Sequence, residues 1–222
     1  MLKQTAMAVL VGFCALAAYG AAAPPQSTWV PADPAVECVD VQDKALCAEL
    51  LALRDKDQIP QHRLLESPKD PALLAELGRA DAENLARLLS IVDEHGWPRT
   101  SQVGERAAGA AWLIIQHADL EVQERFIGVM QAAAEAGELD RSLIALTIDR
   151  IRVGQGKPQV YGTQFKEVDG KLVLEPLQDP QHVDQRRASV GLPPLAEYEA
   201  LIREVYGSKP KAKEQTSRQE PQ

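Results

Sequence analysis

The amino-acid sequence predicts a mainly α-helical protein, a single helical-bundle domain with a small β-hairpin in its C-terminal half. Two observations lead to this prediction. From residue 41 to residue 153, apolar side chains recur at intervals of three and four, the spacing of helices with one buried face. The period then changes around Asp169-Gly170, a dipeptide that favours a tight hairpin turn because it supplies positive φ angles. We find no internal repeat.

The chain divides into four parts. Residues 1–22 resemble a secretory signal, with a short apolar core and a stretch of small residues after it. Residues 23–36 form an extended leader, residues 37–207 the helical domain, and residues 208–222 a polar tail that we expect to be disordered. A retained membrane anchor is the weaker alternative, since spanning a bilayer takes about 20 apolar residues. We therefore expect a periplasmic or secreted protein without a stable membrane span after signal removal.

Cys38 and Cys47 are the only cysteines left once the signal is removed. An even pair in an exported protein predicts a disulfide. Nine residues along one helix span roughly 13 Å, whereas bridged Cα atoms lie within about 7 Å of each other. Cys38 must therefore precede the helix that carries Cys47. The spacing is not Cys-x-x-Cys, so the bridge is expected to be structural rather than a redox centre.

Five helices are expected before the hairpin. Asp81 and Asp140 are predicted N-caps, and Gly96 and Gly137 are predicted stops. The run of small side chains at 107–111 permits close approach of neighbouring backbones, so its helix should be the central one. The expected helices span residues 41–55, 81–95, 102–117, 121–136 and 140–153.

The C-terminal elements follow in order. Residues 159–165 and 172–174 are the expected strands, and in a strand Tyr161 and Thr163 would face one side and Gly162 and Gln164 the other. A glycine there indicates close approach of either a helix or a ligand. A short helix should begin at Asp179 and end at Gly191, and a last helix should span residues 194–206.

Four short motifs make the chain resemble a bacterial family of unknown function. They are His95-Gly-Trp-Pro98, Gln116-His-Ala-Asp119, Asp149-Arg150 and Tyr161-Gly-Thr-Gln164. Further similar segments are Asp81-Ala-Glu-Asn84, Arg186-Arg187 and Gly191-Leu-Pro-Pro-Leu195, and the resemblance covers residues 45–206. It implies no known activity, cofactor or catalytic residue.

Composition and missing motifs exclude several function classes. The formal net charge of −8, without a basic stripe, argues against nucleic acid as a partner. The sequence has no GxSxG elbow, phosphate-binding loop, HExxH motif or catalytic cysteine, which removes the common hydrolases and nucleotide enzymes. We expect no cofactor and no metal. The partner is left as an unknown small molecule, peptide or glycan.

Polar residues that follow or interrupt buried segments form the candidate site. Buried polar groups are unfavourable unless paired, so these residues are expected to share one network. His117 would be the acid or base, because an unperturbed imidazole titrates near pH 6.5, with Asp119 or Asp149 as its orienting partner. Arg150 or Arg186 would clamp an anion. The full set of predicted substrate contacts is Gln116, Arg150, Tyr161, Thr163, Gln164, Arg186 and Arg187.

Each of these roles has an alternative. His117 could be a core histidine that donates to a carbonyl or a carboxylate, and Asp119 could cap the next helix. A metal site would require at least two of His95, His117, Asp119 and Asp149 to converge. Two functions remain: hydrolysis or group transfer on an envelope-side peptide or glycan, or a non-catalytic periplasmic module that binds protein or peptide. A catalytic network should be reachable by water, whereas a structural one should be closed and fully paired.

Overall fold

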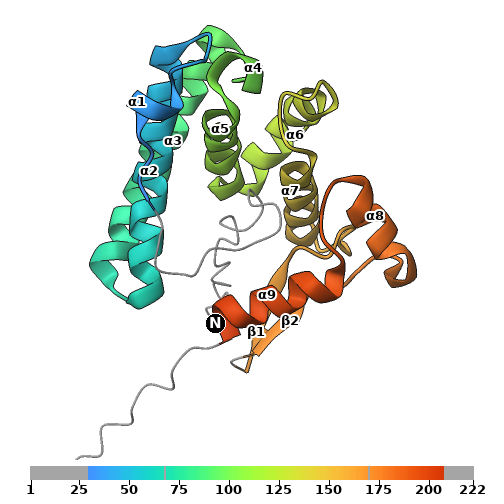
Figure 1. Cartoon of the computed structure of the whole chain (residues 1–222). Helices are drawn as coiled ribbons and strands as arrows, with labels where there is room; N and C mark the ends of the chain where they lie inside the picture. The colour runs from blue at the N-terminus through green and yellow to red at the C-terminus, as the bar shows by residue number, and fades with distance from the viewer. Residues whose placement is uncertain (1–29, 68, 170, 208–222) are drawn as a thin grey trace, which may run out of the picture.

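The computed structural model describes residues 30–67, 69–169 and 171–207 (Figure 1). The predicted signal, the first half of the predicted leader and the predicted C-terminal tail lie outside these ranges. Within them, the structure is mainly helical with one two-stranded antiparallel hairpin, which confirms the predicted fold class. No helix in the described ranges combines the length and the apolar character needed to cross a bilayer.

The N-terminal part of the described structure consists of helices, some of about one turn and others of several turns. They are α1 (Pro34–Glu37), α2 (Lys44–Glu66), α3 (Pro71–His95), α4 (Thr100–Val103) and α5 (Glu105–His117). The C-terminal part continues with α6 (Leu120–Glu135), α7 (Arg141–Gly154), β1 (Phe165–Val168), β2 (Lys171–Leu174), η2 (Pro180–His182), α8 (Val183–Ser189) and α9 (Leu195–Gly207).

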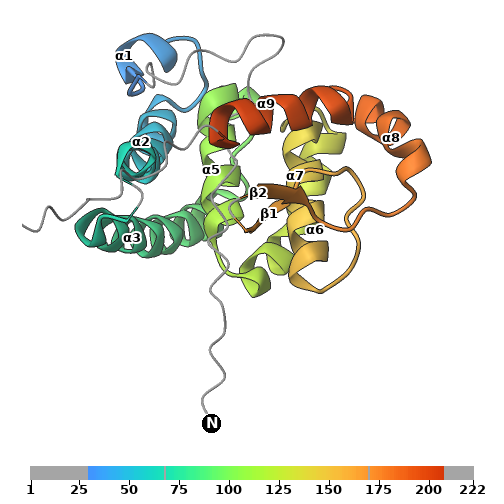
Figure 2. The ribbon, with the colours of Figure 1, turned by 90° about the horizontal axis from the view of Figure 1, so that it is seen from below.

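Helix α5 lies at the centre of this arrangement. It contacts α2, α3, α4 and α6, and Figure 2 shows it between the pair α2 and α3 and the pair α6 and α7. Nine of its residues are buried: Ala107, Ala108, Ala110, Ala111, Trp112, Leu113, Ile114, Ile115 and Gln116. The small residues in its first half let the neighbouring helices approach, so α5 is the central helix that the sequence predicted.

Helices α2 and α3 are both longer than predicted. Helix α2 continues past Asp55 to Glu66, and α3 begins at Pro71, well before Asp81. Asp70 is the actual N-cap of α3, and its carboxylate accepts the N–H of Ala72 at 2.8 Å. An Asp followed by Pro at the first helical position is a strong start signal. The predicted capping role of Asp81 is therefore wrong, and Asp81 lies inside α3.

Helices α4 to α7 lie close to the positions that the sequence pattern predicts. Gly104, with φ of 84°, divides the single predicted helix at 102–117 into α4 and α5. Helix α6 ends just before Gly137, which has φ of 75°. Asp140 caps α7 as predicted, because its carboxylate accepts the N–H of Ser142 at 2.8 Å.

The predicted disulfide is present. Cys38 follows α1 and bonds to Cys47 in α2, with the two Cα atoms 5.9 Å apart. Cys38 lies before the helix that carries Cys47, as the length argument required. The bridge fixes the arm that contains α1 to the first turns of α2.

The hairpin is shorter than predicted. Strand β1 begins at Phe165 and pairs with β2, which places Phe165 opposite Leu174, and Phe165 packs on Tyr198 and Ile202 of α9. Residues 160–164 are loop rather than strand, and Gln159 forms only an isolated bridge with Leu177. The predicted alternation of side chains along 161–165 is therefore wrong, because hydrogen bonds to side chains replace the strand ladder in this loop.

Two glycines give a matched test of the loop. Gly162 has φ of 72°, and a Cβ there would lie 2.9 Å from Cδ1 of Leu195, whereas a Cβ on Gly109 in α5 would meet nothing within 4 Å. We expect Gly162→Ala to lower the free energy of unfolding by about 1–3 kcal/mol, because it adds both strain and a clash. Gly109→Ala should raise it by about 0.5–1 kcal/mol. Urea denaturation measures both, and equal effects would contradict the loop geometry.

Candidate functional site

The predicted site residues are divided between separate polar networks. Asp149 and the residues around 160–164 form one, Gln116 belongs to a second, and His117 belongs to a third. In the first two, Asp149, Thr163, Gln164 and Gln116 are buried. The third contains carboxylates that the sequence analysis did not assign to the site.

Asp149 holds the loop that follows α7. Its carboxylate, fully buried, accepts the N–H groups of Val160 at 2.6 Å, Tyr161 at 3.0 Å and Thr163 at 3.0 Å. The hydroxyl of Thr163 donates to it as well, at 3.0 Å. Burial raises the pKa of Asp149, and the hydrogen bonds from the loop oppose this rise. These contacts give Asp149 a structural role, and its hydrogen bonds do not involve His117.

Arg186 and Arg187 bind the same loop from its carbonyl side. Arg187, fully buried, donates to the carbonyl oxygens of Tyr161 at 2.6 Å and Pro193 at 2.6 Å, and its guanidinium lies 4.9 Å from the ring centroid of Tyr198. Arg186 donates to the carbonyl oxygen of Val160 at 2.9 Å. Backbone carbonyls thus accept from both arginines, whereas Nη2 of Arg187 is buried without a hydrogen-bond acceptor among the residues described. Binding of an anion by these arginines stays a prediction.

Gln159, Thr163 and Gln164 complete this closed network, and all three are buried. The amide oxygen of Gln159 accepts the N–H of Gln164 at 2.8 Å, and the side chain of Gln164 donates to the hydroxyl of Thr163 at 3.0 Å. The predicted substrate contacts at Thr163 and Gln164 therefore lie inside the protein. Tyr161 is partly exposed, and it lines a pocket of about 300 Å³.

Gln116 joins α5 to α7. The hydroxyl of Thr147 donates to the amide oxygen of Gln116 at 2.9 Å and accepts from the indole of Trp112 at 2.9 Å. Gln116 is fully buried, so its contacts are with the protein core rather than with solvent. Arg150 is partly buried beside Asp149 on α7, and its Nε has no hydrogen-bond acceptor among the residues described.

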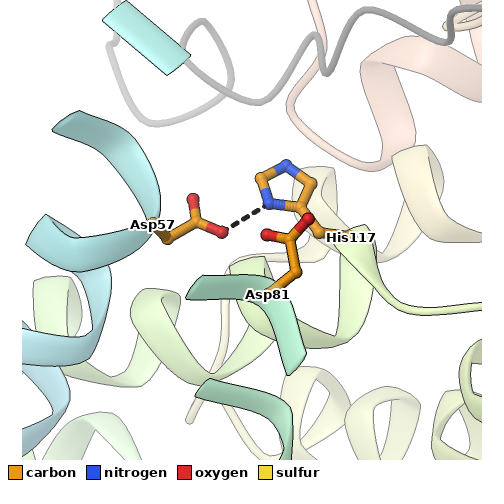
Figure 3. A group of neighbouring side chains, drawn as sticks. All are labelled: Asp57, Asp81 and His117. Atoms are coloured by element: carbon orange, nitrogen blue, oxygen red, sulfur yellow. Dashed lines mark hydrogen bonds and ion pairs between the residues drawn. The ribbon is translucent and has the colours of Figure 1, made fainter. Parts of the chain in front are cut away.

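His117 lies at the end of α5 and meets α2. Its Nδ1 is 2.7 Å from Oδ1 of Asp57, whose side chain is 1% exposed (Figure 3). The other oxygen of Asp57 accepts from the amides of Gln58 at 2.6 Å and Gln61 at 3.2 Å. The carboxylate that orients His117 is therefore Asp57, in place of the predicted Asp119 or Asp149. The side chain of His117 remains 9% exposed.

Asp81 in α3 brings a second carboxylate to His117 (Figure 3). Asp57, Asp81 and His117 each offer one possible ligand atom, and these three atoms lie within 4.8 Å of one another. Burial raises the pKa of Asp81 to about 6, the negative charge of Asp57 adds to the rise, and His117 opposes it. The Oδ1 atom of Asp81 is buried and has no hydrogen-bond partner in the described part of the chain.

The remaining predicted residues do not join this cluster. Asp119 is exposed at the N-cap position of α6, although its side chain makes no capping hydrogen bond. His95 is exposed at the end of α3, 3.7 Å from Glu94. Of the four residues proposed for a metal site, only His117 belongs to the group of possible metal ligands found in the described ranges.

The sequence signal for this cluster was present but weak. The polar run that contains Asp57 is typical of a helix end, although α2 continues beyond it. Asp81 is of a residue type typical of an N-cap, although α3 begins ten residues earlier, at Pro71. The start signal Asp70-Pro71 would have placed Asp81 inside a helix.

Comparison with known proteins identifies the family of the chain. Residues 44–211 match DUF6624, a family of unknown function. The chain belongs to this family. The DUF6624 region begins at the first residue of α2 and includes Asp57, Asp81, His117 and the loop held by Asp149, whereas Cys38 precedes it. No curated protein and no solved structure matches the chain.

Replacement of Asp149 tests its structural role. In Asp149→Asn the new amide group would point N–H donors at the N–H groups of residues 160–163, so we expect a loss of about 3 kcal/mol in the free energy of unfolding. Urea denaturation measures the loss. Asp119→Asn is the matched control and should change stability by less than about 0.5 kcal/mol. Wild-type stability in Asp149→Asn would contradict the structural assignment.

Asp81 should make stability depend on pH. The pKa of Asp81 in the folded protein is about 6, above its ordinary value of 3.8, so the folded state binds the proton more tightly than the unfolded state does. The folded state therefore loses stability as the pH rises from 3.8 to about 6. Asp81→Asn should therefore raise the free energy of unfolding at pH 7.5 by about 1–2 kcal/mol, allowing for partial exposure, and should have little effect near pH 4.

Urea denaturation at both pH values, in buffer that contains EDTA, measures this difference. The control is Asp93→Asn, which replaces an exposed carboxylate of the same helix. Destabilisation by Asp81→Asn at pH 7.5 would show that the Asp81 carboxylate has a stabilising partner.

Proposed function

We propose that the protein is an exported enzyme that catalyses hydrolysis or group transfer on an envelope-side peptide or glycan. Its chemical centre is the cluster of Asp57, Asp81 and His117. The observation that carries the proposal is an imidazole held by a buried carboxylate, beside a second carboxylate whose pKa is raised to about 6. General acid–base catalysis works best with groups that titrate near the working pH.

Asp57 acts as a positioning residue for His117. It accepts the proton on Nδ1, which leaves the lone pair of a neutral imidazole on Nε2. The two glutamine amides on Asp57 fix the carboxylate in turn. In this arrangement His117 is the base that takes a proton from the attacking water or hydroxyl group.

Asp81 is the complementary acid. With a pKa of about 6, it can hold a proton near neutral pH and pass it to a leaving group, whereas an ordinary aspartate is fully ionised there. Asp81 and His117 are both partly exposed, so water can reach them, while Asp57 is sealed. The cluster therefore has one protected positioning residue and two accessible groups for proton transfer.

The compartment supports the substrate class. Residues 1–22 resemble a secretory signal, and the disulfide between Cys38 and Cys47 is of the kind that persists in oxidising compartments. Peptide and glycan linkages are the bonds that an exported hydrolase or transferase meets outside the cytoplasm.

A second candidate function is a non-catalytic module that binds a peptide or another exported protein. The pocket of about 300 Å³ favours it, because its lining is largely apolar and comes from α6, α7, α8 and the loop held by Asp149. Tyr161, one of the predicted substrate contacts, lines this pocket together with Ile144, Ile148 and Val190. Such a pocket fits an apolar side chain of a bound peptide.

The test of the enzymatic proposal is a turnover assay with the exported form of the chain. Soluble cell-wall glycan strands and an unstructured peptide mixture are the substrates, and mass spectrometry detects bond cleavage or transfer. We expect His117→Gln and Asp81→Asn to lower the rate by about 10²–10⁴-fold. The wild-type rate should fall as pH rises through about 6, and Asp81→Asn should lack this dependence.

His182→Gln is the matched control, because His182 also contacts an aspartate, Asp179, at 2.9 Å, but in an exposed position outside the cluster. Turnover that both cluster variants retain would contradict the proposal. Peptide binding without turnover, abolished by Val190→Glu and retained in Asp81→Asn, would support the binding module instead.

A further inference from the structure

We propose that Asp57, Asp81 and His117 bind a divalent first-row transition-metal ion, for which Zn²⁺ is the probe. The inference concerns the cluster on which the proposed function rests, and it adds a ligand for that cluster. Metal binding can be measured without any substrate, so the two proposals can fail separately.

Three helices hold the possible ligands in place. Asp57 comes from α2, Asp81 from α3 and His117 from α5, and each of these helices contacts the other two. One ligand atom from each residue lies within 4.8 Å of the others (Figure 3). Ligands of a tetrahedral zinc ion lie roughly 3.4 Å apart, given bonds of about 2.0–2.2 Å. Small side-chain rotations therefore suffice, and the contact between His117 and Asp57 lengthens to admit the ion.

The charge of the cluster favours a cation. Two carboxylates face one imidazole, and no lysine or arginine of the described chain makes an ion pair with Asp57 or Asp81. Buried charges in proteins are normally paired or coordinate a metal. The Nδ1 atom of His117 lies 2.7 Å from Asp57, and the buried Oδ1 of Asp81 has no hydrogen-bond donor among the described residues. A cation between the three residues would bind both carboxylates at once.

Asn84 provides an independent observation beside the cluster. It lies one turn after Asp81 on α3, and its amide group donates at 2.9 Å to the carbonyl oxygen of Leu53, one turn before Asp57 on α2. Its side chain is fully buried, yet its Oδ1 atom has no hydrogen-bond donor among the described residues. Two buried carbonyl or carboxylate oxygens of α3, one on Asp81 and one on Asn84, therefore lack a donor within one turn of each other.

The ligand types select the class of metal. Carboxylates accept many divalent ions, but an imidazole favours Zn²⁺ and its transition-metal neighbours over Ca²⁺ and Mg²⁺. Three protein ligands are the number found in catalytic zinc sites, which keep a further position for water. Gln58 and Gln61, which donate to the second oxygen of Asp57, would orient that ligand in the manner of outer-shell residues.

Isothermal titration calorimetry tests the inference. The exported form of the chain is freed of metal with a chelator, transferred to chelator-free buffer at pH 7.5 and titrated with ZnCl₂. We expect one equivalent to bind, and Asp81→Asn to weaken the affinity at least about tenfold, since even outer-shell changes cost about 10–100-fold. Zn²⁺ should also raise the Tm of the wild-type protein and leave that of Asp81→Asn unchanged.

The control is Asp179→Asn, which removes the carboxylate of the exposed pair with His182 and should leave the affinity unchanged. No binding of Zn²⁺ would overturn the inference, and so would equal affinity in the wild-type protein and Asp81→Asn. Turnover that depends on Asp81 and persists in EDTA, without Zn²⁺ binding, would refute the metal site and leave the proposed function intact. Zn²⁺ binding at the cluster without turnover of either substrate class would support the metal site and contradict the proposed function.

Discussion

Burial of α5 is the constraint on which the rest of the structure depends. Helices α2, α3, α4 and α6 pack against it, and its small residues let them approach closely enough to exclude solvent. The hydroxyl of Thr147 in α7 joins the same helix through Trp112 and Gln116. Because α5 ends at His117, the packing that forms the core also places an imidazole where α2 and α3 meet it.

A second constraint, polar rather than apolar, positions the C-terminal part. The loop at 160–163 is held on its N–H side by Asp149 and on its carbonyl side by Arg186 and Arg187. A loop with its backbone groups buried must have them all paired. These charged residues supply the partners, so the polar residues that the motifs contain are used mainly to build the fold.

The cluster of Asp57, Asp81 and His117 has a different character. Asp81 is partly buried without a hydrogen-bond partner for its Oδ1 in the described ranges, and its raised pKa reflects an unfavourable environment for its charge. An arrangement that reduces stability is typical of functional sites rather than of structural networks. A proton and a metal ion are two ways to relieve the same repulsion, which is why both proposals concern these residues.

The sequence by itself determined the helical class, the disulfide between Cys38 and Cys47 and the cap at Asp140. Each follows from local spacing, local capping chemistry or chain length. Only the tertiary structure decided which carboxylates meet His117. Asp57 and Asp81 are remote from it in sequence, and they reach it because α2 and α3 extend further than their apolar patterns indicate and pack against the end of α5. Contacts between helices depend on how whole helices pack, and no short sequence pattern encodes that packing.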